Sequence, residues 1–283
     1  MVRYGRARCS PARTKLRAAF LARSRWHTLG RMSELPFFSK WAPKTMIARV
    51  GVLVVLLSTW PHPVRGLQGP SVPELLRQFE GEKVFWRQFD VAKAIISAND
   101  TSVFPRLKSW LTHDDRQLRG NAAFVFAGLG DHHGLDVIVS ILSDHSEKRE
   151  VHQISSVGSP SIQGQIRQDR YYAAHLLGDL KDPRAIPILV PLLTDAEVNY
   201  IVPWSLGQIG GRSAITPLIG SLSDPDPNMR VLAIHALVEL KATEALPRLR
   251  QLFDDGAKST FDKLESVAYA SQTAVAQLQL ETR

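Results

Sequence analysis

Residues 170–195 read RYYAAHLLGDLKDPRAIPILVPLLTD, and this stretch decides the fold. Four of its apolar residues are spaced by 3, 1 and 3 positions and therefore share one face of a helix: Ala173, Leu176, Leu177 and Leu180. Asp182-Pro183 ends that helix, because proline disrupts a helix interior but fits the first turn of the next one. A second helical face follows at Ile186, Leu189, Val190 and Leu193. The stretch predicts two amphipathic helices joined by a tight turn.

The same pattern recurs at nearly constant intervals along the chain. It is found at Leu177–Leu180, at Leu206–Ile209 and again at Leu237–Leu240. Alanines and aspartates keep these intervals: Ala185, Ala214, Ala245 and Asp195, Asp224, Asp255. A period of about 30 residues with helical apolar content is typical of stacked helix pairs. We therefore expect an all-α fold, a right-handed α-solenoid of about five helix pairs with capping helices.

The repeats are predicted to span residues 85–255, with a degenerate first unit at 85–114. Phe126 of the second unit matches Leu177 of the third, and this longer interval indicates an insertion at 146–167. One position early in the second helix of a unit is occupied by Pro105, Pro187 and Pro247. Since the end repeats of a solenoid would otherwise expose apolar surface, we expect residues 67–84 to form an N-terminal cap and 256–283 a C-terminal capping helix.

The third unit carries the most regular form of the motif. It is made up of Arg170, Ala173, Ala174, Leu177, Gly178, Leu180, Asp182, Pro183, Ala185, Ile186, Pro187, Leu189, Leu193 and Asp195. This motif resembles the HEAT repeat of the phycobilisome-lyase type. The resemblance implies a HEAT-like superhelix. It leaves function open, because repeats of this kind serve as adaptors, chaperones and occasional enzymes.

The resemblance also implies an arginine–aspartate ladder, in which an arginine early in the first helix of a unit pairs with the aspartate that closes a repeat. The candidates are Arg119, Arg170 and Arg230, with Asp144, Asp195, Asp224 and Asp255. Asn199 stands at the arginine position of the fourth unit, so the ladder is expected to be interrupted there. We interpret these residues as structural.

Charge is distributed unevenly along the chain. Residues 1–66 hold 13 of the 35 Lys and Arg residues and one of the 27 acidic residues, Glu34. The remainder, with 22 basic and 26 acidic residues, has a net charge of −4. A nucleic-acid partner requires a basic surface on the folded domain itself, so we expect none. Cys9 is the single cysteine, which leaves no thiol chemistry for the repeats.

Residues 46–66 have the layout of a secretory signal peptide. Arg49 precedes the apolar run Val50–Leu57, and Val64-Arg65-Gly66 predicts cleavage after Gly66. This predicts a periplasmic or secreted protein that touches the membrane only through the signal segment. The alternative is an anchor formed by uncleaved residues 46–66, although the uncharged run is shorter than the ~20 residues that span a bilayer.

Residues 1–45 form a basic leader that a signal peptide would not normally follow. One hypothesis is that translation starts at Met32 or Met46, so that the residues before that methionine are not made. The competing interpretation is a transit peptide, because such peptides are rich in arginine and poor in acids.

The sequence contains no recognisable catalytic, cofactor-binding or metal centre. It lacks a nucleophile elbow, a phosphate-binding glycine loop and the His-Glu dipeptide expected of iron hydroxylases built on similar repeats. His175 and His235 lie singly in predicted helices, where a packed side chain is the simpler interpretation. Asp131-His132-His133 and Asp144-His145 give a weak metal pattern without diagnostic spacing.

The insertion is the least repeat-like part of the body and is the candidate partner-binding segment. Gly158-Ser159-Pro160-Ser161 predicts a turn. Two interpretations remain for the segments on either side of it: they pair as a short hairpin, or the whole stretch is a disordered polar loop. The candidate contact residues are Val151, Ile154, Val157, Ile162 and Ile166. Long loops that interrupt a regular stack are often functional.

From these features we expect a non-enzymatic, exported scaffold or adaptor that binds a protein of unknown identity and uses no cofactor. A solenoid supports this because stacked helix pairs provide one extended binding surface. The alternative, which the family resemblance allows, is a bilin-lyase-like chaperone or lyase that handles a small chromophore or cofactor. An iron-dependent hydroxylase is disfavoured by the absent His-Glu pairs.

Overall fold

The computed structural model describes residues 69–147, 162–260 and 266–280. Within these ranges every extended regular element is a helix, and one isolated β-bridge joins Lys258 to Ser266. None of the described helices is both long and apolar enough to cross a membrane. The predicted all-α solenoid is confirmed.

Within the described ranges, five helix pairs follow one another. Their first helices are α3 (Phe85–Ala98), α5 (Arg116–Gly128), α7 (Ile162–Leu180), α9 (Val202–Ile209) and α11 (Pro227–Glu239). Their second members are η3–α4–η4 (Thr101–Val103, Phe104–Leu107, Lys108–Thr112), α6 (His132–Leu142), η5–α8–η6 (Pro183–Ala185, Ile186–Leu189, Val190–Thr194), η7–α10 (Arg212–Ala214, Ile215–Ser221) and η8–α12 (Thr243–Ala245, Leu246–Arg250). The pairs are flanked by α2 (Val72–Gly81) and α13 (Val267–Leu280).

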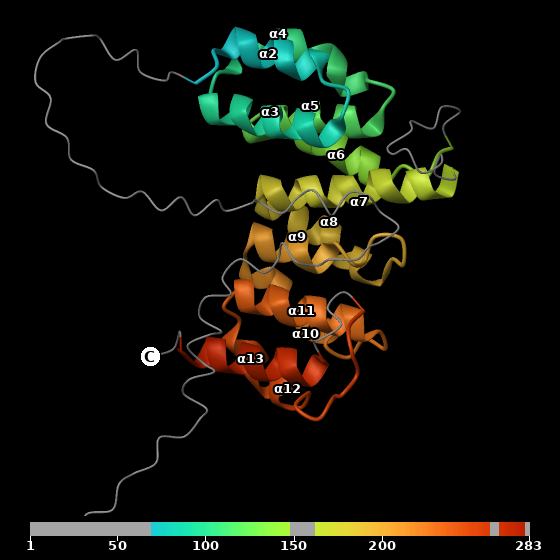
Figure 1. Ribbon diagram of the computed structural model, residues 1–283, viewed down its shortest axis with the longest axis vertical. Helices are drawn as coiled ribbons and strands as arrows, with labels where there is room; N and C mark the ends of the chain where they lie inside the picture. The colour runs from blue at the N-terminus through green and yellow to red at the C-terminus, as the bar shows by residue number, and fades with distance from the viewer. Residues whose placement is uncertain (1–68, 148–161, 261–265, 281–283) are drawn as a thin grey trace, which may run out of the picture. The chain divides into compact units, whose positions relative to one another are not determined.

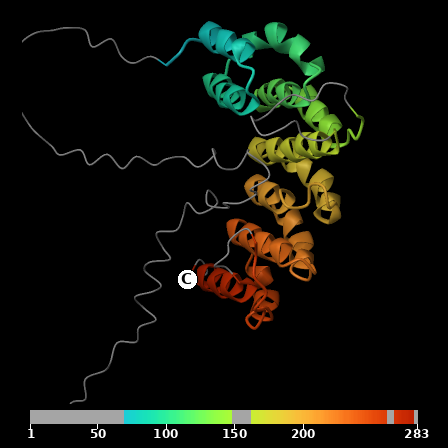
Figure 2. The ribbon, with the colours of Figure 1, turned by 45° about the vertical axis from the view of Figure 1, so that its right-hand side comes forward.

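The first helices form one continuous row. Each contacts the next, from α3 through α5, α7 and α9 to α11, and α11 contacts α13. Figures 1 and 2 show α7, α9, α11 and α13 one below another. The repeated leucines Leu177, Leu206 and Leu237 all have 0% exposure. The residues that give the sequence its period are therefore the core residues that join one pair to its neighbours.

Prolines divide the second members of three pairs into short helical pieces. Pro105, Pro187 and Pro247 each lie in the first turn of an α-helix, those of α4, α8 and α12. Proline has no N–H to donate but needs none in a first turn, so each can follow a 3₁₀ turn directly. The expected placement of these prolines is confirmed.

The insertion is shorter than predicted, because α7 begins at Ile162. Residues 162–167 belong to this helix, since Ile162 and Ile166 continue the helical spacing toward Arg170. At the C-terminal end, the capping helix starts at Val267, later than the predicted 256. The predicted N-terminal cap contains α2. The leader 1–45 and the signal segment 46–66 lie outside the described residues.

Candidate functional site

The aspartates that close the repeats share one local geometry. In each, one carboxylate oxygen, Oδ1, accepts a hydrogen bond from the backbone N–H two residues later. The distances are 2.9 Å at Asp144, 3.0 Å at Asp195, 2.8 Å at Asp224 and 3.1 Å at Asp255. This leaves Oδ2 of each residue available for a second partner.

Arginine occupies that second position in three of the four repeats. Arg170 Nη2 lies 2.6 Å from Asp195 Oδ2, and Arg230 Nη2 lies 2.9 Å from Asp255 Oδ2. Asp144 also binds an arginine, but it is Arg116, whose Nη2 lies 2.7 Å from Asp144 Oδ2. The ladder therefore connects successive repeats through side chains that are nearly or completely buried on the arginine side.

The pairing expected of Arg119 is wrong. Its Nη1 donates instead to the backbone carbonyl of His113, at 2.9 Å. Arg116 and Arg119 are three positions apart, so they lie on neighbouring parts of one helix face, and the spacing alone does not distinguish them. Arg116 lies at the start of α5, where it reaches both Asp144 and Ser146.

The ladder is interrupted at the fourth repeat, where Asn199 replaces the arginine. The Oδ1 atom of Asn199 is buried and has no hydrogen-bond partner among the described residues. Tyr200 makes the nearby contact, donating from its hydroxyl to Asp226 Oδ2 at 2.6 Å. This hydrogen bond to the carboxylate, aided by burial, raises the pKa of Tyr200 to about 12.

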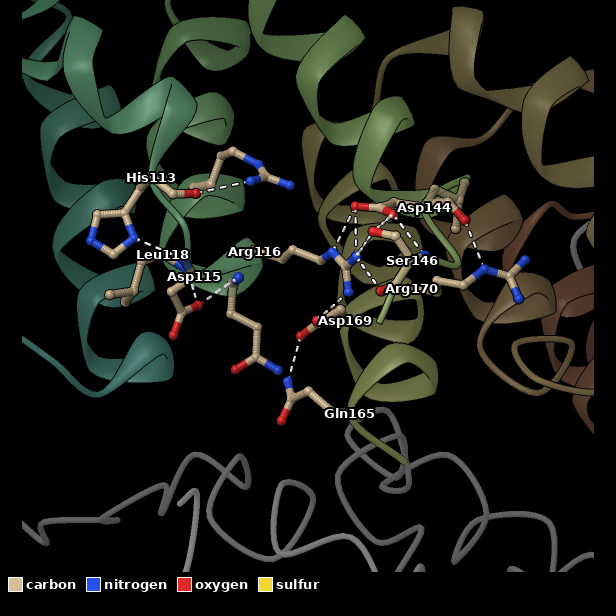
Figure 3. Close-up of polar contacts among 12 residues, drawn as sticks. His113, Asp115, Arg116, Leu118, Asp144, Ser146, Gln165, Asp169 and Arg170 are labelled. Atoms are coloured by element: carbon tan, nitrogen blue, oxygen red, sulfur yellow. Dashed lines mark hydrogen bonds and ion pairs between the residues drawn. The ribbon is translucent and has the colours of Figure 1, made fainter. Parts of the chain in front are cut away.

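The fully buried Arg116 is the centre of a group that we call the Arg116 cluster: Arg116, Asp144, Ser146, Gln165 and Asp169 (Figure 3). The Arg116 side chain has 0% exposure and that of Asp169 has 3%. Arg116 Nη2 donates to both the carbonyl and the hydroxyl of Ser146, each at 2.7 Å. Its Nη1 lies 3.4 Å from Asp169 Oδ2, so Asp144 is the closer carboxylate.

The two carboxylates of the Arg116 cluster have opposite pKa shifts. Burial opposes ionisation of Asp144, but hydrogen bonds from Ser146 and Arg116 outweigh it, and the pKa of Asp144 is lowered. At Asp169 burial is the dominant influence. It raises the pKa of Asp169 to about 6 despite the hydrogen bond from Gln165 and the charge of Arg116.

A second group, which we call the ring cluster, lies where α3, α7 and α9 meet: Phe89, Tyr172, His175 and Trp204. The rings of His175 and Trp204 are stacked, with centroids 4.5 Å apart and planes 20° apart. Tyr172 is nearly parallel to His175 at 6.3 Å, and its hydroxyl donates to Asn121 Oδ1. Phe89 meets the His175 ring edge-on at 6.1 Å.

The ring cluster is buried on one side and charged at its edge. Phe89, Tyr172 and His175 are buried, whereas Trp204 is half-buried. Lys93 is exposed, and its ammonium lies 4.6 Å from the Phe89 ring centroid. Burial lowers the pKa of His175, which favours a neutral imidazole at neutral pH. Trp204 is therefore the most exposed ring of the cluster, and Lys93, which also pairs with Asp90 Oδ1 at 2.9 Å, lies over the buried Phe89.

The interpretation of His175 as an isolated packed histidine missed the ring cluster. The available signal was the repeat itself, because the interval from His175 to Trp204 equals that from Leu177 to Leu206. Equivalent positions on consecutive first helices are neighbours in a solenoid. The remaining rings of the cluster depend on how α3 packs against α5 and α7, which no local motif encodes.

Of the five predicted partner-binding residues, the structure describes Ile162 and Ile166. Val151, Ile154 and Val157 lie outside the described residues, and Ile162 begins α7. Ile166 has 2% exposure and belongs to the core, so its predicted role in binding a partner is wrong.

The histidines of the weak metal pattern have separate neighbours. His132 Nδ1 lies 2.7 Å from Arg184 Nη1, whereas His133 Nδ1 lies 2.9 Å from Asp131 Oδ1. His145 Nδ1 is 3.7 Å from Glu197. Among the described residues, no group of three or more His, Cys, Asp or Glu side chains could hold a metal ion.

Comparison with known proteins places these repeats in context. Residues 169–195 match the PBS lyase HEAT-like repeat, and residues 194–262 match the HEAT repeats family. The bilin biosynthesis protein PecE of Mastigocladus laminosus is 32% identical over 145 residues, which cover 49% of this chain and 48% of PecE. Phycocyanobilin lyase subunit alpha of Synechococcus elongatus is 35% identical over 102 residues, covering 32% of this chain and 37% of the relative.

Among solved structures, a designed armadillo repeat protein covers 74% of this chain and 100% of its own, with a TM-score of 0.39 and 16% identity. The chain spans at most about half the length of the curated relatives it matches. The names of those relatives overturn the expectation of a non-enzymatic scaffold, because they are bilin lyase subunits and bilin biosynthesis proteins. The repeat motif indicated the fold but not this activity, since the same helices support both kinds of protein.

Proposed function

Because this chain is a HEAT-repeat protein with a repeat of the PBS lyase type, we propose that it is a lyase acting on a bilin or a similar linear tetrapyrrole. The observation that carries the proposal is its 32% identity to PecE over 145 residues. That match extends well beyond the length of a single repeat. The match therefore covers several consecutive repeats.

The ring cluster supports this function. A linear tetrapyrrole is a conjugated molecule with flat rings and carboxylate side chains. Flat rings pack favourably against aromatic side chains, and the half-buried Trp204 presents such a surface at the edge of the cluster. Lys93 is exposed and pairs with Asp90, itself exposed; in this proposal a chromophore carboxylate exchanges with Asp90 as the partner of its ammonium. We assign Trp204 and Lys93 to chromophore binding.

Buried members of the cluster have a positioning role in this proposal. The Trp204 indole stacks on His175, and His175 is held between Phe89 and Tyr172. A side chain fixed by packing loses little conformational entropy when a ligand binds. The cluster therefore provides a rigid aromatic surface, built on three helices, against which a flexible tetrapyrrole can be held in one conformation.

Binding is tested by titrating the purified chain with phycocyanobilin and following the absorption spectrum of the chromophore. We expect saturable binding, and at least a tenfold rise in Kd for Trp204→Leu, a loss of about 1.4 kcal/mol or more. Trp110→Leu is the matched control, because Trp110 is also half-buried but stacks on His113, outside the ring cluster. Equal weakening by both substitutions would remove the ring cluster as the site.

Lyase activity is tested separately, by incubating the chain with bilin and with bilin-bearing polypeptides and measuring by mass spectrometry whether bilin is attached or released. The relatives include subunits, so the assay is run with the purified chain and with an extract of the host. Activity that depends on the chain supports the proposal. Binding without attachment or release in either condition would argue against a lyase.

We further propose that the protein is exported, with residues 46–66 removed as a signal peptide. The support is the charged, apolar and small-residue layout that ends at Gly66. N-terminal sequencing of the mature protein is expected to start at Leu67. A start within residues 1–45 would contradict export by this signal, and an intact 46–66 segment in the membrane fraction would indicate an anchor.

A further inference from the structure

Within the Arg116 cluster, two carboxylates compete for one guanidinium. Asp144 holds the closer position, at 2.7 Å, and Asp169 is at 3.4 Å. Asp144 retains partial access to solvent, with 28% side-chain exposure, whereas Asp169 has 3%. Asp169 is therefore both the more buried and the less well paired of the two.

Gln165, which hydrogen-bonds to Asp169, has a partner for only one of the two polar atoms of its side-chain amide. Gln165, one turn earlier on α7, donates from Nε2 to Asp169 Oδ1 at 2.7 Å. The Oε1 atom of the same amide is buried and has no hydrogen-bond partner among the described residues. A buried acceptor without a donor costs free energy. A protonated carboxyl at Asp169 would supply that donor, once the Gln165 amide turns about its Cγ–Cδ bond.

We propose that Asp169 is a proton-controlled switch for the first two turns of α7, residues 162–168. In acid, a proton from solvent binds the Asp169 carboxylate, the resulting O–H donates to Gln165 Oε1, and Arg116 keeps a single negative partner in Asp144. At higher pH the proton leaves, the carboxylate is ionised in a buried site, and these two turns open more readily. Opening extends to Asp169 itself, so that its carboxylate reaches solvent; α7 as a whole packs on α5, α6 and α9.

The charges around Asp169 act in opposite directions: Arg116 favours the ionised carboxylate, whereas Asp115 and the burial of the site favour the protonated form. The helix α5 contributes Arg116 and Arg119 together with its N-cap, Asp115; the segment after α6 contributes Asp144. With Asp169 ionised, these residues comprise two cations and three anions. One proton removes the excess negative charge from the interior.

The pKa of Asp169 fixes the direction of the effect. Its value of about 6 in the folded protein exceeds the ~3.9 of an unfolded aspartate. A raised pKa in the folded state means that the stabilisation is complete below about pH 4 and is lost as the pH rises through about 6. The two turns are therefore expected to be most stable in acid, opposite to the usual behaviour of an ion-paired aspartate.

Hydrogen exchange of backbone amides in residues 162–168, corrected for the intrinsic effect of pH, tests the switch. Protection is expected to be about tenfold greater at pH 5.0 than at pH 7.5, as follows from pKa values of about 6 and 3.9. In Asp169→Asn, protection at pH 7.5 is expected to match the wild-type value at pH 5.0 and to vary little with pH. Exchange in α11 serves as the internal reference, and Asp179→Asn, on the same helix, should retain the wild-type pH dependence.

A direct measurement keeps the test decisive if a variant fails to fold. The carboxyl carbon of Asp169 in the wild-type chain is followed by NMR as a function of pH. Titration near pH 6 supports the switch. Titration below about pH 4.5, or equal protection of residues 162–168 at the two pH values, would overturn it, independently of whether the chain binds a bilin.

Discussion

At the scale of single residues, the aspartate that closes each repeat uses its two oxygens for different purposes. Oδ1 organises the chain locally by accepting the N–H two residues later, and Oδ2 is free to bind an arginine from elsewhere. An asparagine can reproduce the first contact but not the charge of the second. The local turn and the ion pair can therefore be separated experimentally.

Asp144→Asn is expected to lower the free energy of unfolding by about 1.5–3 kcal/mol at pH 7, since it weakens a hydrogen-bonded ion pair with the buried Arg116. The pKa of Asp144 is lowered in the folded protein. Its stabilising contribution is therefore present above the unfolded pKa of ~3.9 and is lost as the pH falls through the lower folded value. The difference in the free energy of unfolding between variant and wild type, measured by urea denaturation, should therefore become smaller in acid.

Asp224→Asn is the matched control for that experiment. Asp224 has the same local hydrogen bond, to the N–H of Asp226, but makes no ion pair among the described contacts. The substitution is expected to change stability by less than about 0.5 kcal/mol, as for other surface positions. Equal losses in the two variants would show that the ion pair between Asp144 and Arg116 contributes no stability beyond what any aspartate at this repeat position provides.

At the scale of helices, the distance between the first helices of neighbouring pairs depends on glycines, which have no side chain in the way. A Cβ atom at Gly178 of α7 would lie 2.8 Å from the Trp204 ring and 2.9 Å from Ser205 Cα. At the equivalent Gly207 of α9, the nearest atom would be Ala236 Cα, at 3.4 Å. The backbone of α9 therefore approaches α7 through Gly178, whereas α11 leaves room for a methyl group at Gly207.

Gly178→Ala is expected to lower the free energy of unfolding by about 1–3 kcal/mol, because the added methyl group forces α7 and α9 apart. Gly207→Ala is expected to be neutral or to raise stability by up to about 1 kcal/mol, since alanine is the better residue inside a helix. Thermal and urea denaturation compare the two. If Gly178→Ala were as stable as Gly207→Ala, the close approach of α9 would not be a constraint on the fold.

Gly178→Ala also connects the packing of helices to the proposed site. The contact at Gly178 positions Trp204, the half-buried member of the ring cluster. A shift of the indole should weaken phycocyanobilin binding even where the chain remains folded. The change in Kd is expected to follow that of Trp204→Leu in direction and to be smaller, because the ring is displaced and not removed.

At the scale of the whole molecule, the described helices are stabilised mainly by the pairs that precede and follow them. The end of such a series needs a cover, and α13 supplies it by packing on α11 and α12. Its inward residues are buried: Val267, Ala270, Ser271, Ala274, Val275 and Leu278. Its outward Tyr269 and Leu280 are more than half exposed.

A chain that ends at Ser259 is expected to lose on the order of 5 kcal/mol of stability in the last repeat, from the apolar area that Val267, Val275 and Leu278 no longer bury. Exchange protection should fall first in α11 and α12, and the shortened chain should aggregate because their apolar faces are uncovered. Hydrogen exchange and light scattering measure both effects. Tyr269→Ser, which changes only the outer face, should alter neither; unchanged protection in the shortened chain would show that α13 is not a cap.

How far the structure was predictable from sequence differed between elements. The all-α architecture, the five pairs and the prolines of the second helices followed from spacing, because each repeat repeats the same local requirement. The start of α7 did not follow from spacing. This helix begins at Ile162, in a segment that has no counterpart in the other repeats. The expectation of a non-enzymatic scaffold was wrong, because the motif describes how helices pack and contains no chemical group specific to a reaction.

The sequence alone determined which residues form the core and where most helices end, because the regular repeat period, the helical apolar spacing and the helix-breaking prolines act over short distances along the chain. Tertiary structure decided which charges meet and which rings stack. Arg116, and not Arg119, pairs with Asp144. Asp169 is buried beside this pair. His175 stacks on Trp204. These outcomes depend on distances between helices of different repeats, which are set by the combined packing of many side chains and not by the spacing of any one motif.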